Sequence, residues 1–112
     1  MSQITTHILD TSLGKPAANV NILLEEENNG VWRELARGKT DGDGRIKNLL
    51  SESTTVEPGV YRLVFDVGAY YSSMNIKTFY PSVKIEFRIT DKTHYHVPLL
   101  LNPFGYTTYR GS

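Results

Sequence analysis

The 112-residue sequence contains no cysteine, no long apolar run and no excess of either charge. The missing cysteine excludes a disulfide framework and thiolate chemistry. Twelve basic residues balance twelve acidic ones, and neither sign forms a long run. The sequence therefore predicts no nucleic-acid partner and no binding to an anionic membrane surface. No apolar stretch approaches the roughly eighteen residues of a membrane span.

The length favours one domain covering residues 1–112, which is long enough to bury a core without covalent staples. Met1 to Thr6 is polar and lacks the charged and apolar regions of a signal peptide. A cytoplasmic location is therefore the default expectation.

A period of two residues dominates the chain and indicates strands. From Val83 to Ile89, apolar side chains alternate with charged or polar ones, as in a strand with one face in a core and one in water. Similar strands are expected at 4–9, 20–25, 31–39, 61–67, 94–101 and 106–110, with a short helix allowed at 68–75. Turn residues recur along the chain, among them Asn29-Gly30, a strong hairpin signal. The pattern predicts an all-β sandwich of about seven or eight strands.

The C-terminal segment concentrates the residues that suggest chemistry. In a strand over His94 to Leu101, the histidines share one face with Pro98 and Leu100, while the better core face carries Tyr95, Val97, Leu99 and Leu101. Pro98 has no N–H to donate, so we expect an edge or an irregular pairing there. The turn 102–105 then returns residues 106–110 antiparallel, which places the chain terminus near the histidines.

Two metal sites deserve consideration from the residues alone. His7, His94 and His96 could bind zinc with an open position, but no cysteine or suitably spaced carboxylate accompanies them. Asp41-Gly42-Asp43-Gly44 suggests calcium, yet Arg45 and Ile46 stand where the EF-hand needs a ligand and a glycine. We therefore expect no metal and no other cofactor. A single strand histidine is more often structural than functional, as is an arginine in a turn.

The motifs HYHVPLLLNPFGYTTYRGS at the C-terminal end, THILD followed by GKPA near the start, and TDGDGR in the middle resemble those of the 5-hydroxyisourate hydrolases, the transthyretin-related enzymes of purine breakdown. The resemblance covers nearly the whole chain. It implies a transthyretin-like (prealbumin-like) sandwich of two four-stranded sheets with one short helix. It also implies a homotetramer with active sites between subunits and a small purine-derived substrate.

The resemblance further implies residue roles. His7, Arg45 and His96 match the catalytic residues of the family, and His94 is expected to support them. Tyr109 and Ser112 join His7 and Arg45 as expected substrate contacts, and Gly111 offers unusual backbone angles that could turn Ser112 inward. Further walls of the pocket could come from the remaining outward residues of these strands: Leu9, Pro98, Leu100 and Thr107. Asn102, Phe104 and Thr107 depart conservatively from the usual tail of the family.

The implied reaction is hydrolysis of 5-hydroxyisourate at a ring amide, which yields 2-oxo-4-hydroxy-4-carboxy-5-ureidoimidazoline. No nucleophile has an evident base beside it in sequence, so direct attack by water is simpler than a covalent intermediate. Either His7 or His96 could be the base. The alternatives are a non-catalytic transthyretin-like carrier of small ligands and a plain structural sandwich. Neither explains why His7, Arg45, His96 and the terminal YRGS occur together.

Overall fold

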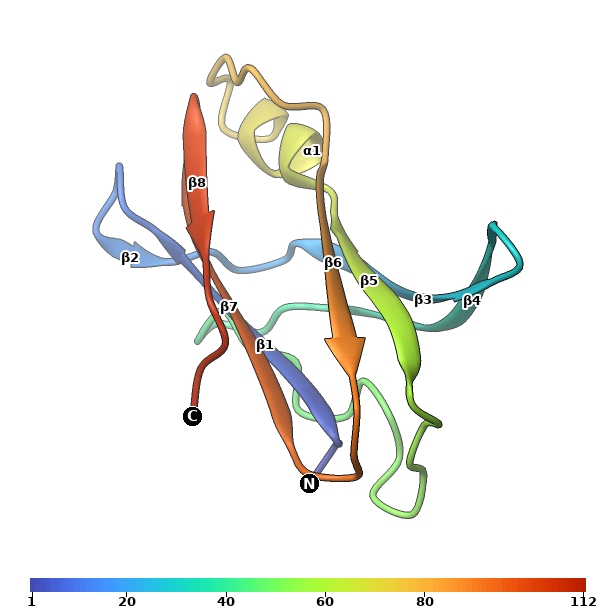
Figure 1. The fold of residues 1–112 in the computed structure, drawn as a ribbon. Helices are drawn as coiled ribbons and strands as arrows, with labels where there is room; N and C mark the ends of the chain where they lie inside the picture. The colour runs from blue at the N-terminus through green and yellow to red at the C-terminus, as the bar shows by residue number, and fades with distance from the viewer.

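The chain folds into two facing four-stranded sheets, seen in a computed structural model that describes all residues 1–112 (Figure 1). One sheet has the order β2-β1-β7-β8 and the other β4-β3-β5-β6. The strands are β1 (Ile4–Asp10), β2 (Lys15–Pro16), β3 (Asn21–Asn28), β4 (Val31–Lys39), β5 (Gly59–Phe65), β6 (Val83–Ile89), β7 (Tyr95–Asn102) and β8 (Gly105–Thr108). A single helix, α1 (Val67–Ser72), follows β5. The expected sandwich is confirmed.

The space between the sheets is filled by the alternate residues that the period of two predicts. On β7 the predicted core face is confirmed, because Tyr95, Val97, Leu99 and Leu101 are all buried. The core cluster holds 22 buried apolar residues, and each fully buried large side chain stabilises the fold by about 1.5–3 kcal/mol. The opposite residues of β1 and β7 are left on the outer face of their sheet. His7 and His96 are among them.

Local signals in the sequence explain the turns and the helix. Asn29 and Gly30 join β3 to β4 with φ values of 53° and 81°, the positive angles that a tight hairpin turn requires. The Asp66 side chain caps α1 by accepting a hydrogen bond from the Ala69 N–H at 3.2 Å. The helix is shorter than the 68–75 segment allowed for it, since residues 73–75 lie beyond its end. It is far too short to cross a bilayer, and the fold contains no other helix.

Pairing around Pro98 is irregular, as expected, but β7 is a central strand and not an edge. It pairs in parallel with β1 and antiparallel with β8. The β7–β8 ladder stops at Leu99↔Thr108 and resumes only as a single bridge, His96↔Gly111, in the same register. Pro98 lies in the gap and cannot donate a backbone hydrogen bond. The last strand therefore ends at Thr108, short of the Arg110 that the sequence pattern suggested.

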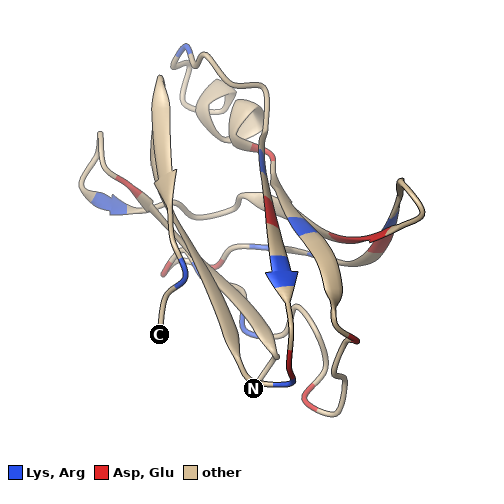
Figure 2. Ribbon diagram, in the orientation of Figure 1, with Lys and Arg blue, Asp and Glu red and all other residues tan.

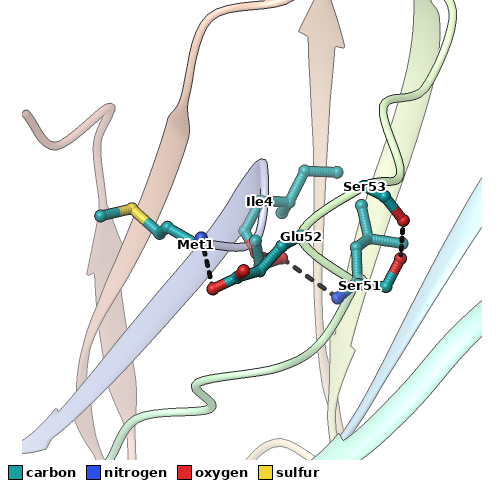
Figure 3. A network of polar contacts seen from close by, with 7 residues as sticks. Met1, Ile4, Ser51, Glu52 and Ser53 are labelled. Atoms are coloured by element: carbon teal, nitrogen blue, oxygen red, sulfur yellow. Dashed lines mark hydrogen bonds and ion pairs between the residues drawn. The ribbon is translucent and has the colours of Figure 1, made fainter.

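The segment before β1 is tied to the long connection between β4 and β5. The buried Ser2 hydroxyl donates to the Ile4 carbonyl at 2.7 Å and accepts from the Leu50 N–H at 3.1 Å. The Met1 amino group contacts the Glu52 carboxylate at 3.1 Å in the same polar network (Figure 3). That exposed ion pair adds little stability, but the buried serine fixes the start of β1 against the connection.

Candidate active site

The candidate site is built on the outer face of the β1–β7 pair. The parallel register places Thr5 beside His96 and His7 beside Pro98. Register partners point to the same side of a sheet, so all four side chains share one face. Figure 2 shows how few charged residues β1, β7 and β8 carry; β1 contributes only Asp10. The strands themselves therefore bring almost no charge to this face.

Arg45 reaches this face from the connection that follows β4. The Asp41 carboxylate accepts hydrogen bonds from the backbone of Asp43 at 2.9 Å and of Arg45 at 3.1 Å, which closes a tight turn. Gly44 then passes so near β1 that a Cβ on it would lie 2.5 Å from the Ile8 carbonyl. Arg45 follows as an antiparallel bridge partner of His7. The Gly-rich turn thus delivers a guanidinium beside a histidine.

The C-terminal residues close the other side of the site. The Gly111 N–H donates to the His96 carbonyl at 2.9 Å. A Cβ on Gly111 would lie 2.5 Å from Cδ2 of the His96 ring and 3.1 Å from Cγ of Pro98. Gly111 does not adopt a positive φ, so the expectation of unusual backbone angles is wrong. Glycine is required here because the backbone packs directly against the imidazole.

These segments enclose a cavity of about 330 Å³, at the small end of ligand sites. Arg45, His96 and Ser112 all line it, so the structure brings three of the predicted site residues together. The other lining residues are Met1, Thr5, Thr6, Ile46, Lys47 and His94. His7 is not part of the lining and stands next to it, paired with Arg45.

Tyr109 is not brought into this cavity. It lines a separate hollow of about 450 Å³ between β6 and the C-terminal segment, together with Arg110 and Tyr95. Of the other predicted walls, Pro98 packs against Gly111, whereas Leu9, Leu100 and Thr107 do not line the cavity. Within one protomer, the predicted contact between Tyr109 and substrate therefore has no geometric support.

The electrostatics favour neutral histidines. Burial lowers the pKa of His7 below its ordinary value, and the charge of Arg45 lowers it further. Burial and Arg45 likewise lower the pKa of His96, with smaller contributions from His94 and His7. Both imidazoles are thus available as proton acceptors near neutral pH.

The histidines do not converge on a common point that would suit a metal. The rings of His94 and His96 stack with their centroids 6.3 Å apart, and each directs a nitrogen at the Thr5 hydroxyl. The Asp41 carboxylate is occupied by backbone N–H groups of its own turn. No group of three or more histidine and carboxylate side chains is placed to hold a metal ion.

Sequence reasoning missed Thr5 and Lys47. Thr5 shares the outward face of β1 with His7, so strand parity could have marked it as a neighbour. Its contact with both histidines depends on the β1–β7 pairing, which no local pattern specifies. Lys47 lies two residues after Arg45 and adds a second cation to the cavity. In the sequence, only its position two residues after Arg45 pointed to Lys47 as a site residue.

The architecture and the site together define a transthyretin-like sandwich that carries a histidine–arginine cavity on the outer face of one sheet. A family model described as the HIUase/transthyretin family matches residues 4–111. The chain belongs to this family.

Both hydrolases and a transthyretin are among the proteins that this chain resembles. The 5-hydroxyisourate hydrolase of Salmonella dublin is 47% identical over 110 residues, which cover 97% of this chain and 80% of that protein. The solved structure of the 5-hydroxyisourate hydrolase of Klebsiella pneumoniae is 35% identical, with a TM-score of 0.86 and coverage of 97% and 98% of the two chains. Sea bream transthyretin, solved in complex with thyroxine, is 34% identical, with a TM-score of 0.91 and coverage of 98% and 95%.

Proposed function

We propose that this chain hydrolyses 5-hydroxyisourate to 2-oxo-4-hydroxy-4-carboxy-5-ureidoimidazoline, a step of urate degradation, at the cavity lined by Arg45, His96 and Ser112. The observation that carries the proposal is the convergence of Arg45 and two histidines of lowered pKa on one nearly uncharged sheet face. The substrate follows from the similarity to hydrolases, at 47% identity for the Salmonella dublin protein.

The chemistry we propose is direct attack of water on a ring amide. A neutral imidazole, His96 or His7, takes a proton from the water as its oxygen bonds to the amide carbon. The positive charge of Arg45 stabilises the oxyanion that forms on the carbonyl oxygen. The C–N bond then breaks, and the imidazolium returns the proton to the leaving nitrogen. Ser112 orients the substrate, and no metal or other cofactor takes part.

A carrier of small ligands is the alternative, supported by the similarity to sea bream transthyretin in complex with thyroxine. The residues of the cavity argue against it here. Burying part of an imidazole beside a guanidinium costs desolvation energy, and a protein that only binds an apolar ligand gains nothing from it. An enzyme that transfers a proton does gain from it, because a partly buried imidazole beside a guanidinium stays neutral and can accept the proton.

We further propose that the working form is a homotetramer with the sites at subunit interfaces. The outer face of the β1–β7 pair carries half-buried Leu9 and Leu100 and almost no charge, which suits contact with a second copy. Tyr109 could contact substrate only across such an interface. Sedimentation of a fully active monomer at assay concentrations would contradict this proposal. A cytoplasmic location stays a prediction, which cell fractionation can check.

The test of the activity is the decay of freshly generated 5-hydroxyisourate, followed by ultraviolet absorbance with and without chelator-treated protein. Faster decay than the spontaneous reaction, lost in His96→Ala and kept after chelation, is expected. Decay at the spontaneous rate, with the protein folded, would overturn the proposed activity and leave the carrier as the better description.

A further inference from the structure

The Thr5 hydroxyl sits between two imidazoles. Its Oγ1 lies 2.8 Å from Nε2 of His94 and 2.8 Å from Nδ1 of His96. Thr5 and His96 are register partners in the β1–β7 pair, and the neighbouring Thr6 hydroxyl donates to the Val97 carbonyl at 2.6 Å. The β1–β7 pairing therefore fixes the hydroxyl relative to the His96 ring. Thr5, His94 and His96 also line the same cavity.

Counting protons restricts the directions of the two hydrogen bonds that join His96, Thr5 and His94. A hydroxyl has one proton to donate, and a neutral imidazole has one N–H and one bare nitrogen. With both rings neutral, Thr5 must therefore donate to one ring and accept from the other. If His96 donates from Nδ1, its Nε2 carries a free lone pair. If Thr5 donates to His96 instead, Nε2 carries the proton and His96 cannot act as a base.

The surroundings select between these arrangements. The Nδ1 of His96 is engaged by the Thr5 hydroxyl, and the Thr5 backbone also hydrogen-bonds the ring. The guanidinium of Arg45 lines the cavity with His96, and its charge acts on that ring. A cation favours a lone pair over an N–H in its field. We therefore adopt the arrangement with a bare Nε2, which leaves a lone pair on the ring that the Arg45 charge acts upon.

We propose that Thr5 is a positioning residue that fixes the tautomer of His96, with His94 as the acceptor at the end of the chain. His96 Nδ1–H donates to Thr5 Oγ1, and the Thr5 hydroxyl donates to Nε2 of His94. His96 is then held with its lone pair at Nε2, ready to take a proton. This inference rests on the proposed hydrolysis for its purpose, but its geometry does not depend on the substrate.

The assignment gives His94 a role other than metal binding. His94 is exposed and stacks beside His96, and the Arg110 guanidinium donates to its carbonyl oxygen at 3.3 Å. Its ring needs only a bare Nε2 to hold the Thr5 proton in the productive direction. An uncharged acceptor of similar reach, such as glutamine, should therefore replace it in part.

The direct test is nitrogen-15 NMR of the histidine rings in the full-length protein without substrate, at a pH where both rings are neutral. The wild type should show His96 protonated on Nδ1. Thr5→Val keeps the β-branched shape but removes the hydroxyl, and the Nδ1–H form of His96 should lose its dominance. Thr5→Ser should restore it. Protonation of His96 on Nε2 in the wild type would overturn the proposal, whatever the protein hydrolyses.

Kinetics supply a second readout. Thr5→Val should lower kcat by about tenfold to a hundredfold, less than loss of the base itself, because a free imidazole still adopts the reactive tautomer part of the time. KM should change little, and Thr5→Ser should retain most of kcat. Equal kcat in the Val and Ser variants would refute the positioning role.

A double-mutant cycle tests the part assigned to His94. If Thr5 and His94 act through one chain, Thr5→Val combined with His94→Ala should lose no more kcat than Thr5→Val alone. His94→Gln should lie nearer the wild type than His94→Ala. Additive losses would show that His94 acts independently of Thr5 and would remove it from the chain.

Discussion

Gly111→Ala offers a sharp test of how the C-terminal segment serves the site. The added Cβ would lie 2.5 Å from Cδ2 of His96, whereas carbon atoms pack best at about 3.5–4.0 Å. One of the two groups must therefore move by about 1 Å. Pro98 blocks another direction, since its Cγ would be 3.1 Å from the new methyl group. The imidazole is the softer neighbour and should be displaced.

A displacement of about 1 Å at a reacting group can cost on the order of a hundredfold in rate. We therefore expect Gly111→Ala to lower kcat for 5-hydroxyisourate by roughly one to two orders of magnitude. The melting temperature should change little, because Gly111 lies outside the core and joins the sheet through a single bridge. The assay is the ultraviolet decay of the substrate at equal concentrations of folded protein.

Gly105→Ala is the matched control on the same hairpin. A Cβ there would meet only the Asn102 side chain, at ordinary contact distances of 3.6 Å and beyond, so its activity should stay near that of the wild type. Wild-type kcat in Gly111→Ala would refute the claim that the glycine exists to let the backbone pack on His96. Equal losses in both variants would point to the hairpin as a whole.

Three further predictions concern the site and the fold. His7→Ala and His96→Ala should each lower kcat by about two to four orders of magnitude with the melting temperature nearly unchanged; unfolding of either variant would make that histidine structural. Arg45→Met should raise the pKa of both histidines, because it removes the positive charge that lowers them. The fall of kcat/KM on acidification should therefore begin at a higher pH than in the wild type, while Arg45→Lys should keep the wild-type profile. Identical pH profiles in the Met variant and the wild type would contradict the proposed charge effect. Thr40→Val should lower the free energy of unfolding by about 1–3 kcal/mol in urea titrations. The buried Thr40 hydroxyl hydrogen-bonds two backbone groups, which would both lose their partner. A loss as small as that of the exposed Thr55→Val would show that water replaces the hydroxyl.

The sequence predicted the sheets well because their signals are local. Alternation from Val83 to Ile89 requires only neighbouring residues, and so does the Asn29-Gly30 turn. The same parity placed His7 and His96 correctly on outward faces. Pro98 showed where a ladder would fail, but nothing nearby showed that its strand lies inside the sheet. An edge and an interrupted central ladder give the same sequence pattern at a proline.

The geometry of the site could not be predicted in this way, because it depends on pairing between distant segments. Thr5 meets His96 only through the parallel β1–β7 register, which joins residues about ninety positions apart. The sequence suggested that Gly111 uses the unusual backbone angles open to glycine, whereas the real constraint is an imidazole from another strand. Arg45 and Ser112 were assigned by resemblance to a family, and no property of either residue alone distinguished it from a solvated one.

Shape alone does not separate the two activities that this sandwich suggests. The similarity to sea bream transthyretin, at a TM-score of 0.91, is at least as great as the similarity to the Klebsiella pneumoniae hydrolase, at 0.86. A fold shared so closely cannot carry the functional argument, so the outward residues of β1 and β7 must. Arg45, Thr5 and Gly111 come from three separate segments, and each constrains the same His96 ring through charge, a hydrogen bond or direct packing. Stability of the sandwich requires none of these constraints, since the core lies on the other face of the sheet. Their coincidence on one imidazole is explained by a reaction that needs its lone pair held in place, and it has no comparable explanation in a protein that only binds.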